Sequence, residues 1–572
     1  MTETPFQTLE RSRVDSGFKG RLWAVAVAAT VLACGFELWW FARTCFNEID
    51  YDGVGYIGIA RHIRAGQFYA AINSIRSPMI SWLIAAGSFF SADYLLVGKI
   101  VNIASFLFCL ALVYALTESL WSSRLAAAIA ALLFALGRGL AAATVESITP
   151  DFLFAALALV YFLLLLQALR KDRPQDWFLV GAVHALAFLS KAFALPWMAV
   201  CTFVALILSS VPTTDQTALA AEAPGRSWKT RLIRLVTAAL IPTVIAGGWA
   251  GVLHSKYGVY TFGSQFRLNL VQWTLGAARE HRDPTYAVLT DTTKDYDEYI
   301  VLDMPPGSWM WTYHIDMKRA LPKIVGAEIR NVPRVAKELT IVETPGAMLA
   351  FLLALAALVR KRLRSTVEWR FGVVSAVAVV SLVTAYSMLV VDARYLYPLL
   401  PLILAVAAGF LAGNDDPGFR LGRKICVALV VAGVVFSLTY RSSPFRTLNR
   451  DFQVSCRDAG NQLRAHRSAR FVSLGAGPFP EHGVGWEAGF KAAYFGGSRI
   501  VATTDSLPDA TQLTILPADI RKASPDAIIV WAKPDNIRRV SLLQTLLSTF
   551  PHQSSETIVD PSLGEVGLVI FR

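Results

Sequence analysis

The chain has 572 residues, of which 54% are hydrophobic and only 17% are charged, and its mean hydropathy is +0.46. This balance excludes an ordinary soluble enzyme and predicts a polytopic α-helical membrane protein. A formal charge of +12 would suit nucleic-acid binding if it were gathered on one domain. Much of it falls instead in short segments between apolar runs, where it orients membrane spans, so we expect no nucleic-acid partner.

The length of the apolar runs predicts about eleven transmembrane helices. The runs cover 22–42, 95–117, 123–141, 149–169, 177–190, 193–210, 232–253, 343–360, 368–391, 396–413 and 424–439. The run at 177–190 is short and is followed by Lys191, which favours a tilted or broken helix pair. The first run follows a basic tail and is long enough to stay in the bilayer rather than to be removed as a signal peptide.

The distribution of basic residues predicts how the chain crosses the membrane. If the N-terminus is cytoplasmic, the inner loops carry the cationic clusters at 124, 170–173, 226–234, 360–364 and 420–424. This agrees with the positive-inside rule only if Pro78–Phe90 does not cross the bilayer, so we expect an interfacial or re-entrant helix there. A bacterial inner (plasma) membrane is the expected location.

Two parts of the chain differ in character. Residues 1–440 form the predicted transmembrane domain, with outer loops at 43–94 and 254–342. Residues 441–572 form a predicted extracytoplasmic α/β domain, with strands at 470–474, 499–503, 527–531 and 567–571, a helix at 538–550 and a plain glycine-rich loop at 475–483. Within the second outer loop, the basic amphipathic segment Asp316–Val342 predicts a helix along the membrane surface, with a solvated linker helix as the alternative.

The six cysteines do not form a metal-binding pattern. Four of them lie within apolar runs, where a small buried side chain is the ordinary interpretation. Cys45 and Cys456 would both lie outside the cytoplasm and could pair, although their spacing does not demand a disulfide. We therefore predict no metal-ligating residues from the sequence.

The first outer loop concentrates the residues that could carry chemistry. Asp52 follows Glu48 and Asp50, and such an acidic run is by itself usually just solvated. Its neighbours favour a site, because Tyr56, Arg61, Arg76 and Trp82 follow it at the expected membrane boundary.

The loop resembles a known family. The pattern D-x-x-x-Y-x-x-I-A-R, followed by K/R-x-P-L/M-x-x-W, resembles the first outer loop of lipid-phosphate-dependent glycosyltransferases of the type C membrane fold. This group includes bacterial aminoarabinose transferases and protein O-mannosyltransferases. The matching residues are Asp52, Tyr56, Ile59, Ala60, Arg61, Arg76, Pro78 and Trp82. The chain departs from the family at Gly53, where the family has an acid, and at Arg76-Ser77, where it has Lys-Pro.

Three further segments resemble motifs of this family, and all of them face outward in the predicted topology. Asp151 matches a second acid, Lys191 matches a lysine-bearing turn, and Asp392–Pro401 with Arg394 and Tyr395 matches an R-Y-x-x-P-x-x-P motif. Each has an ordinary alternative. Thr149 or Asp151 could cap a helix, and a basic residue at the end of a span could simply reach toward the lipid headgroups.

The resemblance implies transfer of a hexosyl or pentosyl group from a polyprenyl phosphate to an acceptor, with inversion at the anomeric carbon. Asp52 would be the general base, and Asp151 would orient the acceptor or sugar or share that role. The remaining site residues would bind substrate: Arg76, Lys191 and Arg394 at the phosphate, with Arg61, Tyr56 and Tyr395 around it. The acceptor could be lipid, glycan or protein. No cofactor is required, although the nearby carboxylates could hold a divalent metal.

Two other functions remain open from the sequence. A transporter or flippase of lipid-linked sugars would also be a polytopic membrane protein, but that class more often shows internal repeats and ionisable residues in mid-membrane. A membrane anchor for an active α/β domain would need a catalytic motif in the tail, and none stands out there. The ionisable residues gather at one predicted face, which favours the glycosyltransferase.

Overall fold

The computed structural model is described here for all residues except 1–4, 138, 210–227, 276–286, 294–296, 298, 300, 343–344, 361–366, 390–391, 413–419, 440–444, 476–483, 505–506, 532–536, 551–553, 561–563 and 571–572. The predicted basic clusters at 226–234 and 360–364 and the predicted loop at 475–483 fall partly outside these residues.

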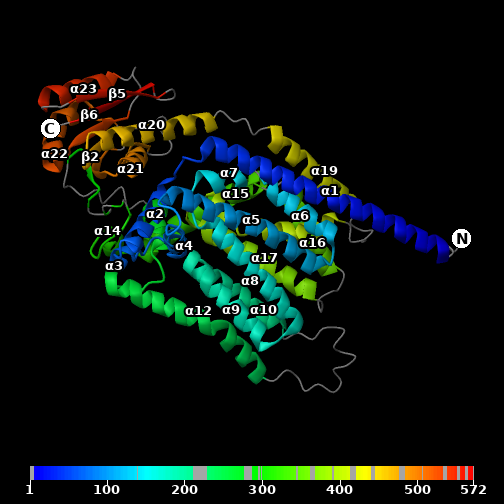
Figure 1. Cartoon of the computed structure of the whole chain (residues 1–572). Helices are drawn as coiled ribbons and strands as arrows, with labels where there is room; N and C mark the ends of the chain where they lie inside the picture. The colour runs from blue at the N-terminus through cyan, green and yellow to red at the C-terminus, as the bar shows by residue number, and fades with distance from the viewer. Residues whose placement is uncertain are drawn as a thin grey trace.

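Every predicted apolar run coincides with a helix. Figure 1 shows these helices packed along one another, with a small sheet at one end of the bundle. In chain order they are α1 (Pro5–Cys45), α5 (Tyr94–Trp121), α6 (Arg124–Ala135), α8 (Asp151–Lys171), α9 (Pro174–Ser190), α10 (Ala194–Ser209), α12 (Trp228–Tyr257), α16 (Pro345–Arg360), α17 (Val367–Ser387), α18 (Leu400–Leu411) and α19 (Arg420–Thr439).

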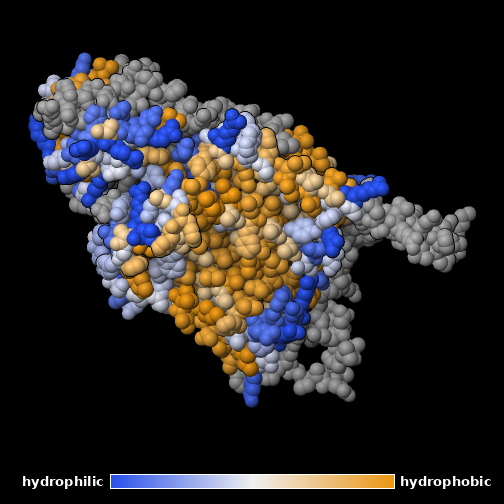
Figure 2. All heavy atoms as spheres, in the orientation of Figure 1, coloured by the Kyte–Doolittle hydropathy of each residue, from blue (hydrophilic) through white to orange (hydrophobic). Residues whose placement is uncertain are grey.

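The helical body has the surface of a membrane protein. Figure 2 shows a broad apolar band over the bundle between two hydrophilic ends, one of which carries the sheet. Within the described residues, five helices are long and apolar enough to cross a membrane, or six if one bent pair counts as a single span. The polytopic architecture is thus supported, while the count of about eleven spans stays a prediction.

The apolar run predicted at 123–141 is divided between two helices. Helix α6 ends at Ala135, and a second helix, α7 (Leu140–Glu146), continues at an angle of 51°. Gly139 lies between them with φ +78°, a left-handed conformation that glycine adopts without steric cost. The break predicted near Lys191 is confirmed, because α9 ends at Ser190 and the Lys191 backbone is extended.

Short helices occupy the two predicted outer loops, 43–94 and 254–342. The first loop holds α2 (Tyr51–Arg64), α3 (Phe68–Ala71) and α4 (Met79–Gly87). Helix α4 has nine residues and spans about 13 Å, so it is too short to cross the bilayer, as predicted. The second loop contains α13 (Gln265–Asn269), the π-helix η1 (Leu270–Thr274), α14 (Trp309–Thr312) and α15 (Met317–Val342), and the 3₁₀ helix η3 (Ala393–Leu396) follows α17.

Helix α15 confirms the helix predicted for Asp316–Val342. It packs against α17 and exposes an apolar stripe at four-residue spacing, formed by Met317, Leu321, Val325 and Ile329. That the stripe rests on a membrane surface remains a prediction.

The C-terminal part contains a six-stranded sheet in the order β1-β3-β2-β4-β6-β5. Its strands are β2 (Arg470–Leu474), β3 (Arg499–Thr503), β4 (Ala527–Val530), β5 (Ser554–Asp560) and β6 (Gly564–Ile570), with the helices α20 (Phe445–Ala465), α21 (Val484–Gly496), α22 (Ala510–Ala523) and α23 (Ile537–Thr549). Strands β2, β3 and β4 are parallel, and β6 runs antiparallel to β4. Four strands and α23 agree with the sequence prediction to within a few residues, whereas β5 was not predicted.

One strand of this sheet comes from the second outer loop. Strand β1 (Thr290–Asp291) pairs antiparallel with β3, with Thr290 opposite Thr503. The sheet is therefore completed by residues that precede 441 in the chain. Cys45 and Cys456 do not form the disulfide that the sequence allowed, because both are buried free thiols.

Candidate functional site

The N-terminus of α2 places two aspartates in different environments. Asp50 is the N-cap residue, and its carboxylate accepts hydrogen bonds from the backbone N–H of Gly53 (3.2 Å) and of Ile148 (2.8 Å). The cap fixes the start of the helix and ties it to the segment before α8. Asp52 lies in the first turn with its side chain 31% exposed, and it makes different contacts.

Two arginines from distant segments bind the Asp52 carboxylate. Arg76 Nη2 lies 3.3 Å from Asp52 Oδ1, and Arg394 Nη1 lies 2.7 Å from Oδ2. Arg394 also donates through Nε to Asp392 Oδ2 at 2.8 Å, and Asp392 caps the short helix η3. One guanidinium therefore bridges two carboxylates, a geometry that the arginine fork allows and a lysine would not.

Arg76 is held in place from several sides. Its side chain is 4% exposed, and its backbone N–H donates to Asn73 Oδ1 at 2.8 Å. The guanidinium carbon lies 5.4 Å from the ring centre of Tyr51 and 5.6 Å from that of Tyr56. A Cβ atom at Gly55 would lie 2.5 Å from the same guanidinium carbon, so only glycine leaves room for it.

A second ion pair lies beside the first. Asp151, whose side chain is 3% exposed, is bound by the Lys191 ammonium group at the break between α9 and α10. Asp151 makes no capping hydrogen bond at the start of α8, so the helix-cap alternative does not describe its role. Lys191 also lies 4.6 Å from the ring centre of Tyr395, and the Arg394 guanidinium lies 5.4 Å from the same ring.

The structure thus brings most of the predicted site residues into one cluster. Its members are Asp52, Tyr56, Arg76, Asp151, Lys191, Arg394 and Tyr395, which we call the Asp52 cluster. Arg61 does not join it. Its guanidinium carbon lies 4.9 Å from the ring centre of Tyr494 and 5.7 Å from that of Tyr94, about 13 Å along the helix from Asp52.

The charges of the cluster shift neighbouring acids in opposite directions. Burial alone would raise the pKa of Asp52, but the guanidinium groups of Arg394 and Arg76 outweigh it and hold this pKa below its usual value. Burial and then the Asp52 charge raise the pKa of Asp50 to about 6. The two carboxylates on Asp52 and Asp392 overcome the effect of burial and raise the pKa of Arg394, which therefore stays charged.

Sequence reasoning missed three residues that shape this cluster. Asp392 is the second partner of Arg394, and its place two positions before that arginine at a helix start was an available signal. Gly55 was signalled by the glycines at 53, 55 and 58, because glycine is unfavourable inside a helix unless something must approach closely. Asp50 occupies the space beside Gly53, where a Cβ would lie 2.6 Å from its Oδ1. This leaves no room for the acid that the family has there.

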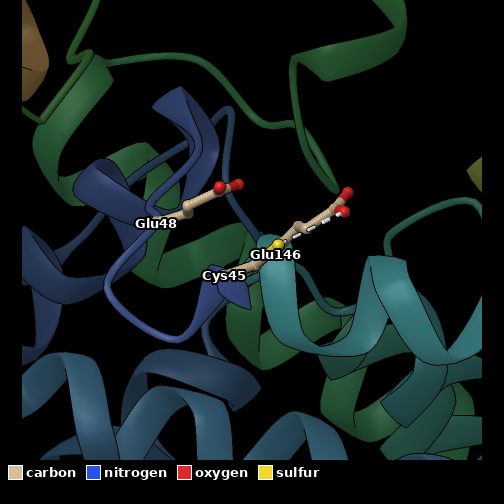
Figure 3. Close-up of side chains that lie close together, drawn as sticks. All are labelled: Cys45, Glu48 and Glu146. Carbon is tan, nitrogen blue, oxygen red and sulfur yellow. Dashed lines mark hydrogen bonds between the residues drawn. The ribbon is translucent and has the colours of Figure 1, made fainter. Parts of the chain in front are cut away.

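A separate group of side chains could hold a metal ion. Figure 3 shows Cys45, Glu48 and Glu146, whose ligand atoms all lie within 4.8 Å of one another. The Cys45 thiol donates to Glu146 Oε1 at 3.9 Å, and burial followed by the Glu146 charge raises the pKa of Glu48 to about 7. One thiol and two carboxylates are ligands that Zn²⁺ accepts. The sequence did not single out this group, because Glu146 is distant in the chain.

A cavity lies at the other end of α2. Its volume is about 460 Å³, and it is lined by His62, Gln67, Ala70, Lys256, Asp297, Asp303 and Arg499. None of these residues belongs to the Asp52 cluster. Four of its side chains pair with one another: His62 Nε2 lies 2.5 Å from Asp297, and Lys256 Nζ lies 2.6 Å from Asp303. We therefore place the candidate active site at the Asp52 cluster, where acids and cations meet and where the pKa of Asp52 is lowered and that of Arg394 is raised.

Comparison with known proteins identifies a related family. Residues 75–249 match the family described as dolichyl-phosphate-mannose-protein mannosyltransferase. The matched segment is less than a third of the chain. The matched segment contains Arg76, Asp151 and Lys191, whereas Asp52 and Arg394 lie outside it. No curated protein matches the sequence.

The fold resembles that of two solved membrane enzymes. The structure of ArnT from Cupriavidus metallidurans bound to undecaprenyl phosphate aligns over 97% of this chain and 98% of its own, with 12% identity and a TM-score of 0.52. The apo oligosaccharyltransferase of Archaeoglobus fulgidus aligns over 89% of this chain and 69% of its own, with 12% identity and a TM-score of 0.50. At such identity the likeness establishes the fold alone.

These findings confirm the resemblance that the loop motifs indicated. The chain is similar to the type C membrane glycosyltransferases in sequence over 75–249 and in fold over nearly its whole length. It is a multi-pass membrane protein of this architecture. The roles of the individual residues in the Asp52 cluster remain to be proposed.

Proposed function

We propose that this protein is an integral-membrane glycosyltransferase that moves a sugar from a polyprenyl-phosphate donor to an acceptor on the extracytoplasmic side. The observation that carries the proposal is the position of the Asp52 carboxylate between the guanidinium groups of Arg76 and Arg394. Such a transfer needs a base and phosphate-binding cations. Here the proposed base, Asp52, is in direct contact with both arginines.

The cations suit the leaving group. When the bond between the anomeric carbon and the phosphate oxygen breaks, polyprenyl phosphate departs with the bonding electrons and gains negative charge. Arg76 and Arg394 would bind that phosphate through paired N–H donors, and Lys191 would add a point charge. Fixed cations in a partly dry site stabilise a developing anion more than water does, because they need no reorganisation.

The same arginines explain how Asp52 becomes a useful base. While they hold its carboxylate, the pKa of Asp52 is lowered and the carboxylate is a weak proton acceptor. An incoming phosphate competes for both guanidinium groups and brings a second negative charge. Both effects raise the pKa of Asp52, so the base is released when the donor binds and not before.

The reaction is then a direct displacement. The acceptor oxygen or nitrogen forms its bond to the anomeric carbon while the carbon–phosphate-oxygen bond breaks, and Asp52 takes the acceptor proton. Attack from the face opposite the leaving group inverts the anomeric carbon. Asp151, fixed by Lys191, would orient the acceptor or the sugar, and Tyr56 and Tyr395 would line the site.

The proposed setting follows from the predicted topology. The N-terminus would lie in the cytoplasm of a bacterial cell, and the C-terminal α/β domain would lie outside the inner membrane. The donor carries a hexose or a pentose on a polyprenyl phosphate, and the acceptor is a lipid, a glycan or a protein. The donor would reach the site from within the membrane. This is consistent with the position of the cluster, because Asp52 and Asp151 lie at the starts of α2 and α8 and Lys191 follows the end of α9.

The test is a transfer assay with the full-length protein in lipid nanodiscs. Polyprenyl-phosphate sugars are supplied with an envelope extract as acceptor, and the release of polyprenyl phosphate and the anomeric configuration of the product are measured. Asp52→Asn should lower the rate by about 10²- to 10⁴-fold. Asp316→Asn is the matched control, because Asp316 is also an outer-loop aspartate paired with an arginine, Arg319, at 3.5 Å.

The flippase alternative predicts a different result. In liposomes it would move a lipid-linked sugar between leaflets without forming free polyprenyl phosphate, and Asp52→Asn would leave that movement unchanged. A folded wild-type protein that translocates the donor and releases no lipid phosphate with any acceptor extract contradicts the proposal.

A further inference from the structure

The C-terminal α/β part and the first outer loop share one apolar core. Val54 and Ile57 of α2 are buried in the same cluster as Phe490 and Ala493 of α21, together with Trp531 after β4. Helices α2 and α21 lie in direct contact, at the end of the bundle that carries the sheet (Figure 1). The helix that presents Asp52 is therefore packed partly by residues more than 400 positions later in the chain.

Helix α2 needs such support. It has only 14 residues and contains glycine at 53, 55 and 58. Each interior glycine weakens a helix by about 1 kcal/mol relative to alanine, and an isolated helix this short is marginal in water. The glycines cannot be exchanged freely, because Gly53 and Gly55 lie against Asp50 and Arg76. Tertiary packing must therefore hold the helix in shape.

Helix α21 contacts α2 near both of its ends. The rings of Tyr51 and Phe490 have centres 5.5 Å apart at an angle of 52°. At the other end the Arg61 guanidinium carbon lies 4.9 Å from the ring centre of Tyr494. Tyr51 and Arg61 are separated by about 15 Å along a helix, so the two contacts fix both the position and the direction of α2.

The first of these contacts continues into the Asp52 cluster. Tyr51 contacts both Phe490 and the Arg76 guanidinium, with its ring centre 5.4 Å from the guanidinium carbon. Arg76 in turn binds Asp52 at 3.3 Å. Four side chains therefore link the C-terminal part to the proposed base.

We infer that Phe490 and Tyr494 are positioning residues for the proposed transfer, and that the C-terminal α/β domain acts as the support that aligns Asp52 with Arg76. This rests on the proposed function. Phe490 acts through Tyr51, and Tyr494 acts through Arg61, which accounts for an arginine of the first-loop motif that does not reach the Asp52 cluster. Neither residue touches the reacting atoms.

The experiment compares three variants of the full-length protein in nanodiscs. Phe490→Ala removes the ring against Tyr51, and Phe490→Tyr keeps it. Leu546→Ala is the control, because Leu546 of α23 is fully buried in the same domain but belongs to a different core cluster, which contains Ile520 and Val530. Each variant is assayed for kcat, for donor KM, for the pH dependence of the rate and for hydrogen–deuterium exchange of the α2 amides.

Phe490→Ala should lower kcat by about 10- to 100-fold, because a small displacement of a reacting group has a large effect on rate. Donor KM should rise as well, because Arg76 is one of the proposed phosphate-binding residues. As Arg76 moves away from Asp52, the acid limb of kcat/KM should move to higher pH, and the α2 amides should exchange faster. Phe490→Tyr should behave like the wild type. Leu546→Ala should change neither the acid limb nor α2 exchange.

The inference is overturned if Phe490→Ala keeps the wild-type acid limb and α2 exchange. It is also overturned if Leu546→Ala reproduces the full effect, since the domain would then matter only through its overall stability. Failure of the proposed function has a different signature. The wild type would transfer no sugar, whereas α2 exchange in Phe490→Ala would still decide whether α21 supports the helix.

Discussion

Arg394 Nη1 donates to Asp52 Oδ2 at 2.7 Å, although 342 positions separate the two residues in the chain. The contact joins the first outer loop to the segment after α17, and the same guanidinium binds Asp392. An acid held in this way is ionised but poorly basic. In the proposed mechanism, the site therefore binds an anion first and accepts a proton afterwards.

The pH dependence of the rate should show whether donor binding precedes proton acceptance by Asp52. In the free protein the guanidinium groups lower the pKa of Asp52, so its base form persists as the pH falls through the ordinary carboxyl range. Bound phosphate draws those groups away and raises the pKa of Asp52. The acid limb of kcat, which reports the complex, should then lie about one pH unit or more above that of kcat/KM, which reports the free protein.

The titration of Asp50 could also appear in these pH profiles, because burial and the Asp52 charge raise its pKa to about 6. Its contribution must therefore be removed. Asp50→Asn keeps an oxygen that can cap the helix and removes that titration. The two limbs should remain apart in this variant. If they coincide, donor binding does not release Asp52.

Two substitutions of Arg394 should distinguish the contribution of its positive charge to activity from that of its planar guanidinium group. Arg394→Lys keeps the charge but cannot bridge Asp52 and Asp392, so we expect donor KM to rise and kcat to fall by about tenfold. Arg394→Leu should lose about 100-fold or more, since Asp392 is left without its cation and Asp52 keeps only Arg76. Arg319→Leu, at an outer-loop arginine that is 89% exposed, should leave both constants unchanged. A lysine variant as active as the wild type would mean that the fork has no role.

Gly55→Ala tests the space reserved for Arg76. The added Cβ would lie 2.5 Å from the guanidinium carbon, so Arg76 must move, and activity should fall by about 10- to 100-fold. Alanine favours helix formation by about 1 kcal/mol over glycine, so the loss of activity should not come from loss of the helix. Gly251→Ala in α12 is the matched control, because nothing lies within 4 Å of a Cβ there. An active Gly55→Ala protein would show that Arg76 has other productive positions.

The Asp151–Lys191 pair should contribute to stability as well as to activity. Lys191→Met leaves the carboxylate of Asp151, 3% exposed, without its ion-pair partner, which should destabilise the protein by about 3–5 kcal/mol. The double variant Asp151→Asn with Lys191→Met removes the buried charge and should recover most of that stability while remaining inactive. Thermal unfolding in detergent measures the first effect and the transfer assay the second. A double variant as unstable as Lys191→Met would point to lost packing rather than to a buried charge.

Much of the architecture could be predicted because it depends on local pattern. Long apolar runs must form helices in a bilayer, where each backbone polar group needs a partner within the segment. The alternation of apolar strands with helices after residue 470 likewise indicated the sheet. The bend between α6 and α7 was missed because Gly139 was read only as part of an apolar run, whereas its left-handed backbone interrupts the helix.

The candidate site could be predicted only in part. Shared motifs singled out Asp52, Asp151, Lys191 and Arg394, and their common face followed from charge topology. Arg61 belongs to the same motif as Asp52, yet α2 carries it about 13 Å away, where it meets Tyr494 instead. Membership in a motif does not give the direction of a side chain.

The sequence by itself determined that this chain is a helical membrane protein, since hydropathy acts along the chain. Its charge pattern also predicted an acid, a tyrosine and several cations at one membrane face. Only the tertiary structure decided which acid meets which cation. Asp52, Arg76 and Arg394 come from three separate segments, and α21 supports the first of them from the far end of the chain. Contacts of this kind depend on packing between distant segments, and no local pattern records them.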